Sequence, residues 1–259
     1  MHNNMDHKVL QWITQLEQLC ERLGMSAVYV IVDQAGNVPS LIQDLQHFRP
    51  AIDWVSLIEN EPENEYLDDA PLFLRLNFSL DQHKAWLKIL LRHYSDPARV
   101  LLFFSANDFK LLAGHLQRLT FTEWEGRKGL LRFYDTRIFP TLLSSILDEQ
   151  QKSGFLNIAR LWTWRDRDRH PVWLRGEYEG YEFSNDFLLT LSDAQYSQLG
   201  DISDIEFFIQ KYHSKYPDYT RQSLFEYLWN GLSTMPDEKP LDNEAFFIEY
   251  LSNAKANQT

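Results

Sequence analysis

The residues with the clearest chemical potential lie in the short stretch RFYDTR, from Arg132 to Arg137. Two carboxylates can share acid and base roles if the fold brings them together, and Glu123 and Glu125 precede Asp135 on the same predicted hairpin. This pattern leaves open an α/β hydrolase-like enzyme that uses Asp135 with a nearby Glu. A structural interpretation competes with it, because an aspartate at the start of a helix caps backbone N–H groups. Sequence alone predicts Asp135 as such an N-cap.

Arg137 is harder to place than Asp135. It falls in the first turn of a helix predicted over Thr136 to Leu147, where the helix dipole disfavours a cation. It therefore needs a partner, which is Asp135 itself, another carboxylate or a second protein. Pro140 would remove a hydrogen bond from the interior of that helix, so we expect an irregular first turn and a regular helix that starts near Pro140. Arg132 and Tyr134 should share one face of the preceding strand.

Other catalytic signatures are missing from the sequence. It contains no G-x-S-x-G, P-loop, G-x-G-x-x-G or H-E-x-x-H pattern, and its eight histidines are scattered. The single cysteine, Cys20, excludes an intrachain disulfide and thiolate clusters, and we expect it to be buried in the first helix. The acidic run from Glu59 to Ala70 lacks the spacing of a calcium loop and favours a solvated connection. We therefore expect no metal site and no cofactor.

A second charged segment, RDRDR, alternates in sign. If it is extended, Arg165, Arg167 and Arg169 share one face, and Asp166 and Asp168 share the other. Such a segment is either a salt-bridged hairpin tip or an arginine ridge that meets an acidic protein partner. Arg165 and Arg167 are therefore candidates for protein binding.

The elements around these residues alternate between apolar strands and amphipathic helices. Segments such as SAVYVIVD, PLFLRLNF and ARVLLFFSA predict buried strands, and helices are predicted between them. This pattern indicates an α/β fold whose N-terminal lobe has a mixed, partly parallel sheet flanked by helices. Residues NIARLWTWRDRD and PVWLRGEYEG predict a further strand pair. Their tryptophans are expected to pack in the sheet core.

Beyond Leu189 the sequence predicts helices alone. We expect an α/β domain over residues 1–180 and a smaller all-helical C-terminal lobe over residues 181–259. Apolar rows on two of these helices are candidates for partner contacts, although packing between the helices is the favoured interpretation of each residue: Ile205, Phe208, Ile209 and Tyr212 on one helix, and Leu224, Phe225, Leu228 and Trp229 on the next.

Composition limits the function classes. The 259 residues carry a formal net charge of −12, which disfavours a nucleic-acid binder because phosphate contacts need a basic face. The N-terminal segment has no apolar core of signal-peptide length, and no apolar run approaches the roughly 20 residues of a membrane helix. We expect a cytoplasmic protein without membrane contact.

The stretch LRFYDTRIFPTLLSSILDEQQ resembles the F-R-[FW]-Y-D-P-R motif of the type VI secretion effector chaperones, or adaptors, a bacterial family first catalogued as a domain of unknown function. SAVYVIVDQAG, PLFLRLN, ARVLLFFSA and LLTLSDAQYSQL occur in the family's order, so the resemblance spans about residues 26–215. Thr136 stands where the family has proline. Both residues suit a first helical position, so the local shape is affected more than the resemblance.

The resemblance implies a non-enzymatic adaptor that binds a specific toxic effector and helps to load it onto a VgrG-type spike. The expected partners are therefore a secreted effector protein and the spike protein. The candidate protein-binding residues are Arg132, Tyr134, Asp135, Arg137, Arg165, Arg167 and Trp229. An immunity protein, which binds a toxin to block it, remains a further alternative.

Overall fold

A computed structural model of the protein describes residues 2–36, 40–59, 67–94, 97–178, 187–234 and 242–256. The chain forms two compact units, Met1–Leu191 and Ser192–Thr259, which are described separately below. The boundary predicted between residues 180 and 181 lies outside the described residues. Residues 60–66, the greater part of the acidic run from Glu59 to Ala70, also lie outside the described residues.

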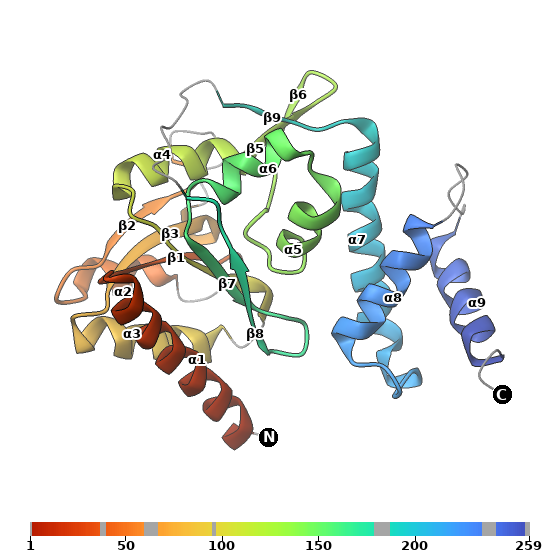
Figure 1. Ribbon diagram of the computed structural model, residues 1–259, viewed down its shortest axis with the longest axis horizontal. Coiled ribbons are helices and arrows are strands. Elements are labelled where there is room, and N and C mark those ends of the chain that lie inside the picture. The colour runs from red at the N-terminus through yellow and green to blue at the C-terminus, as the bar shows by residue number, and fades with distance from the viewer. Residues whose placement is uncertain are drawn as a thin grey trace. The chain divides into compact units, whose positions relative to one another are not determined.

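A six-stranded sheet forms the centre of the first unit (Figure 1). Its order is β2-β3-β1-β4-β7-β8, and each neighbouring pair is antiparallel. The strands are β1 (Ala27–Asp33), β2 (Asp53–Ser56), β3 (Pro71–Asn77), β4 (Val100–Phe104), β7 (Leu161–Arg165) and β8 (Pro171–Arg175). The central strands β1, β3 and β4 are buried along nearly their whole length, which explains their continuous apolar sequence.

Helices cover both faces of this sheet (Figure 1). One face packs against α1, α2 and α3 in a single core that includes Trp12, Val30 and Leu87. On the other face the rings of Phe73 and Phe109 stack at 4.9 Å, and Phe109 begins α4. The helices and short turns of this unit are α1 (His2–Leu23), α2 (Leu41–His47), α3 (Asp81–His93), η2 (Pro97–Arg99), α4 (Phe109–Thr120), α5 (Phe139–Thr141), η3 (Leu142–Ile146) and α6 (Glu149–Leu156).

A smaller sheet of three strands contains a parallel pair. Its order is β6-β5-β9, with β5 (Phe121–Trp124) antiparallel to β6 (Arg127–Leu130) and parallel to β9 (Leu189–Thr190). Glu125 and Gly126 join β5 to β6 with φ values of 49° and 71°, a left-handed two-residue turn that favours glycine. The α/β class with a partly parallel sheet is confirmed, although β9 itself was not predicted.

The tryptophans of the β7–β8 hairpin pack as predicted. Trp162 and Trp164 are buried, and Trp162 lies 4.5 Å from Phe103 between ring centroids. Trp173 of β8 is partly buried against the core on the opposite face. Cys20 is also buried in the core, and burial raises the pKa of its thiol to about 11, as suits a structural cysteine.

The second unit consists of helices, as the sequence predicts. They are α7 (Asp193–Tyr212), the short turn η4 (His213–Lys215), α8 (Arg221–Ser233) and α9 (Asn243–Ala256). Ser192 caps α7 through a capping box with Gln195, which fixes where this helix begins. Glu244 of α9 binds Lys211 and Tyr212 of α7, and Phe208 packs on Phe247 in the core between the two helices. Within the described residues, no helix is long and apolar enough to cross a membrane.

Candidate interaction site

The RFYDTR segment is a buried turn between β6 and α5, and the predicted strand through Tyr134 is wrong. β6 ends at Leu130, and the Leu131 N–H then donates to the Thr120 carbonyl at 2.7 Å. Phe133 and Tyr134 are both buried, because the chain turns inward instead of alternating between two faces. The ring of Phe133 packs edge-on against Phe155 at 5.3 Å. Aromatic burial therefore holds this turn in place.

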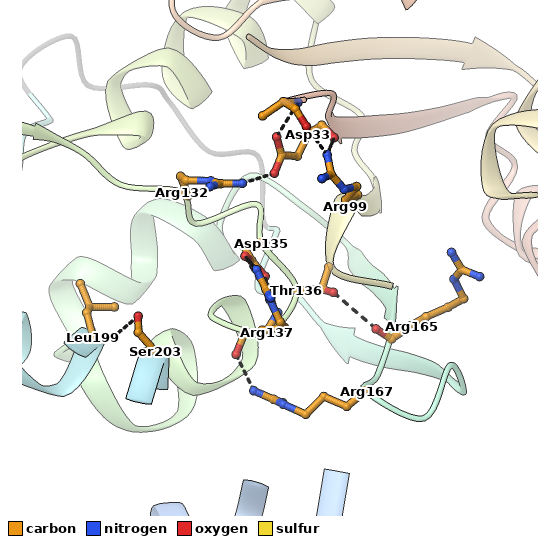
Figure 2. A network of polar contacts seen from close by, with 11 residues as sticks. Asp33, Arg99, Arg132, Asp135, Thr136, Arg137, Arg165, Arg167, Leu199 and Ser203 are labelled. Atoms are coloured by element: carbon orange, nitrogen blue, oxygen red, sulfur yellow. Dashed lines mark hydrogen bonds and ion pairs between the residues drawn. The ribbon is translucent and has the colours of Figure 1, made fainter. Parts of the chain in front are cut away.

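Arg132 extends from this turn to the end of the first strand. Its guanidinium forms an ion pair with Asp33, whose carboxylate is only 5% exposed (Figure 2). The other carboxylate oxygen of Asp33 accepts a hydrogen bond from the Ala35 N–H at 3.1 Å. Arg99 donates to the backbone carbonyls of Asp33 and Ala35 at 3.2 and 2.6 Å. Two arginines therefore fix the point where β1 ends.

Tyr134 lies beside this ion pair. Burial raises the pKa of its phenol well above the ordinary value, and the negative charge of Asp33 raises it further, whereas the Arg132 guanidinium opposes both effects. Tyr134 therefore remains a neutral phenol at physiological pH.

Asp135 caps the irregular turn that precedes α5, so the predicted capping contact is present, although not at the start of a regular helix. Its carboxylate accepts the backbone N–H of Arg137 at 2.9 Å, which closes a local turn, and α5 begins four residues later at Phe139. The same carboxylate accepts Nε of Arg137 at 3.0 Å and Nη2 at 2.6 Å. Arg137 thus finds its partner in Asp135, the first of the three partners predicted. The helix starts next to Pro140, as expected, but it is not regular, because the three-residue α5 continues directly into η3, which is a π-helix.

The β7–β8 hairpin is attached to the same turn (Figure 2). Arg167 donates to the Arg137 carbonyl at 2.9 Å, and the Thr136 hydroxyl approaches the Arg165 carbonyl at 3.4 Å. The Arg165 side chain is itself buried and donates to the Tyr94 carbonyl at 2.8 Å. Of the two alternatives for this segment, the ridge of three arginines on one exposed face is wrong, because Arg165 is buried. Arg165 fastens the sheet to the end of α3 instead.

The structure brings six of the seven predicted site residues together. Arg132, Tyr134, Asp135, Arg137, Arg165 and Arg167 all lie around the RFYDTR turn. Trp229 belongs to the second unit, where it is buried and stacks on Phe225 with an interplanar angle of 7°. Contact of any of these residues with a partner stays a prediction.

This arrangement is better suited to binding than to proton transfer. Both oxygens of Asp135 accept hydrogen bonds from Arg137, and Asp33 is paired with Arg132, so each carboxylate is already engaged. The side chains of Arg132 and Arg137 are 45% and 40% exposed. Among the residues that the structure describes, no group of three or more His, Cys, Asp and Glu side chains could hold a metal ion.

Sequence reasoning missed two members of this network, Asp33 and Arg99. Asp33 directly follows the apolar run VYVIV, and a carboxylate at the end of a buried strand needs a positive partner. That signal indicates a buried ion pair. It does not indicate that the partner is Arg132, which lies 99 residues away in the sequence.

The comparisons with known proteins concern this same part of the chain. Residues 28–153 match the family model described as Domain of unknown function (DUF4123). The DUF4123 match covers just under half of the chain and includes Asp33, Arg99 and the whole RFYDTR turn. It stops before β7. No curated protein and no solved structure matches the chain.

Proposed function

We propose that the protein is an adaptor of a type VI secretion system, which binds a specific toxic effector in the cytoplasm and helps to load it onto a VgrG-type spike without catalysing a reaction. The observation that carries the proposal is the DUF4123 match over residues 28–153, because this family is associated with type VI secretion effector adaptors. The F-R-[FW]-Y-D-P-R resemblance lies inside the matched range and supports the same function.

On this proposal the RFYDTR turn has two roles. Its buried parts, Phe133, Tyr134 and Asp135, hold the end of β1, the small sheet and the β7–β8 hairpin in one arrangement. Its exposed parts, the outer edges of the Arg132 and Arg137 guanidiniums, contact an acidic surface of the partner. Guanidiniums that are held by internal carboxylates lose little side-chain entropy when a partner binds.

The geometry gives no support to the hydrolase-like alternative. A general base needs a carboxylate that can reach a substrate proton, and the carboxylate of Asp135 is only 5% exposed and binds Arg137. An immunity protein differs from an adaptor in its effect on the toxin, so co-expression separates the two functions.

The proposal is tested by co-purification of the full chain with the effector and the spike C-terminal segment encoded in adjacent genes. We expect the protein to bind at least one of them and to leave the toxicity of the co-expressed effector unchanged. Binding to neither protein would refute the adaptor function, and neutralised toxicity would favour the immunity function.

A matched pair of variants tests the exposed guanidiniums. Arg137→Gln removes the charge but keeps a donor for Asp135, whereas Arg127→Gln removes a charge from the exposed strand β6. We expect weaker co-purification for Arg137→Gln only, with circular dichroism spectra unchanged for both. Equal binding by the two variants would show that the turn serves the fold alone.

A further inference from the structure

The outer edge of β8 has the features of a site for an additional strand. β8 is the last strand of the six-stranded sheet, and its other edge pairs with β7. The hydrogen bonds Asp166 N–H to His170 carbonyl and Gly176 N–H to Arg160 carbonyl fix the phase of this pairing. Along β8, successive residues point their backbone groups alternately toward β7 and away from it. Trp173 and Arg175 therefore direct their N–H and C=O groups away from β7, and Pro171 directs its C=O group away.

These outward groups are available for pairing. Within the described parts of the chain, no hydrogen bond reaches the backbone N–H or C=O of Trp173 or Arg175. Pro171 occupies the third outward position, where its missing N–H costs no hydrogen bond within the sheet. The edge therefore presents two donors, from Trp173 and Arg175, and three acceptors, from these residues and Pro171, which is the pattern that an incoming strand needs.

The side chains along β8 also suit strand addition. Val172, Trp173 and Leu174 are each half-buried, so part of their apolar surface is open at the edge of the sheet. Many proteins protect such an edge with an inward-pointing charge or a bulge. The regular register of β7 with β8 shows no bulge, and the apolar run VWL carries no charge.

Charge indicates what kind of strand fits. The exposed charged side chains on and directly beside β8 are Arg169, Arg175 and Glu177, a formal charge of +1 in a chain whose net charge is −12. The β8 edge is thus a locally basic margin on an acidic protein, and it attracts an acidic segment by charge complementarity.

We propose that the β8 edge binds an extended acidic segment of a partner protein, which adds a seventh strand to the central sheet. Backbone hydrogen bonds to Trp173 and Arg175 provide the affinity, and alternating apolar side chains of the segment pack beside Val172 and Leu174 on one face and Trp173 on the other. The proposal rests on the adaptor function in one respect, which is that the acidic segment belongs to an effector or a spike protein.

The test uses the full ¹⁵N-labelled chain and a short synthetic peptide of alternating valine and glutamate. We expect saturable changes in the amide resonances of Trp173 and Arg175 when this peptide is added. An analogue that is N-methylated at alternate residues cannot pair along one edge, and we expect it to cause no such change. A peptide that leaves both amides unaffected at millimolar concentration would overturn the proposal.

Two substitutions at one position separate backbone pairing from charge. Arg175→Pro and Arg175→Ala both remove the guanidinium, but only proline removes the outward N–H, and neither changes a hydrogen bond to β7. We expect Arg175→Pro to bind the peptide about fivefold less tightly than Arg175→Ala, the loss of one hydrogen bond. Equal affinity of the two variants, with unchanged circular dichroism, would overturn the proposal.

Two further outcomes would assign the edge to another occupant. Slow hydrogen exchange at the Trp173 and Arg175 amides without peptide would show that the edge is already covered within the chain. A dimer in sedimentation that Arg175→Pro dissociates would assign the edge to a second copy of the chain. Since the peptide assay uses neither effector nor spike, its result is independent of the co-purification that tests the adaptor function.

Discussion

The carboxylate of Asp135 makes two kinds of contact, and substitution separates them. Asp135→Ala removes the hydrogen bond that closes the local turn and also removes the ion pair with Arg137. Asp135→Asn keeps an oxygen that accepts the Arg137 N–H at the observed 2.9 Å but removes the charge. The loss of stability in Asp135→Ala therefore reports both contacts, whereas the loss in Asp135→Asn reports mainly the ion pair.

The structure sets the expected magnitudes. A side-chain oxygen that caps backbone N–H groups contributes about 1 kcal/mol. The charge-assisted bonds to Arg137 contribute about 1.5 kcal/mol, a value reduced for solvent screening because the arginine side chain is 40% exposed. We expect the free energy of unfolding to fall by about 2.5 kcal/mol in Asp135→Ala and by about 1.5 kcal/mol or less in Asp135→Asn.

Urea unfolding followed by tryptophan fluorescence measures these changes in the relevant unit, since seven of the eight tryptophans lie in residues 1–191. Asp53→Asn is the matched control, because it breaks another aspartate–arginine pair whose side chains are 50% and 41% exposed. That change should cost about 0.5 kcal/mol or less. Equal losses for Asp135→Asn and Asp135→Ala would refute the role of the turn. A loss in Asp135→Ala no larger than the control's would refute both roles.

Three further predictions concern other parts of the first unit. Arg132→Ala removes the guanidinium that pairs with the buried Asp33 carboxylate, so thermal unfolding should show a loss of about 1–3 kcal/mol, whereas a loss as small as that of Asp53→Asn would contradict the ion pair's role. Burial lowers the pKa of His115 from 6.5 to about 4, so the unfolded chain takes up a proton that the folded chain does not. The contribution of His115 to stability is therefore complete above pH 6.5 and decreases as the pH falls towards 4, by on the order of 3 kcal/mol, and urea titrations of His115→Gln should show a flatter pH profile. A Cβ atom at Gly176 would lie 1.8 Å from the Ala159 carbonyl oxygen, so Gly176→Ala should lower the melting temperature strongly, while Gly129→Ala, which meets no atom within 4 Å, should leave it nearly unchanged.

The elements of the fold could be predicted from local sequence, and their pairing could not. Apolar runs and helix stop signals located the major strands and helices, because burial and backbone propensity act over a few neighbouring residues. β9 was missed since two residues carry too little pattern, and its pairing with β5 depends on a contact 67 residues away in the sequence. The antiparallel order of the large sheet likewise depends on which strands lie side by side, and the apolar periodicity of each strand does not reveal its neighbours.

The candidate site shows the same division. The sequence identified RFYDTR as a charged and aromatic cluster and offered Asp135 as one of three possible partners of Arg137, because those two residues are close in the chain. It assigned Arg165 to the surface, since alternation along a strand distinguishes two faces but does not say whether the second face is covered. Asp33 could be recognised as a buried carboxylate in need of a cation, and only the fold identifies Arg132 as that cation.

The position of β7 in the sheet limits how the protein can be divided. β4 lies between β1 and β7, and all five of its residues are buried, yet β7 and β8 follow the end of the DUF4123 match at residue 153. A fragment cut at that residue would therefore expose the long apolar edge of β4 and lose the Thr163 hydroxyl that accepts the Trp12 indole N–H. The region recognised by sequence similarity is thus smaller than the smallest piece expected to remain soluble by itself, and fragments for expression need to extend through β8.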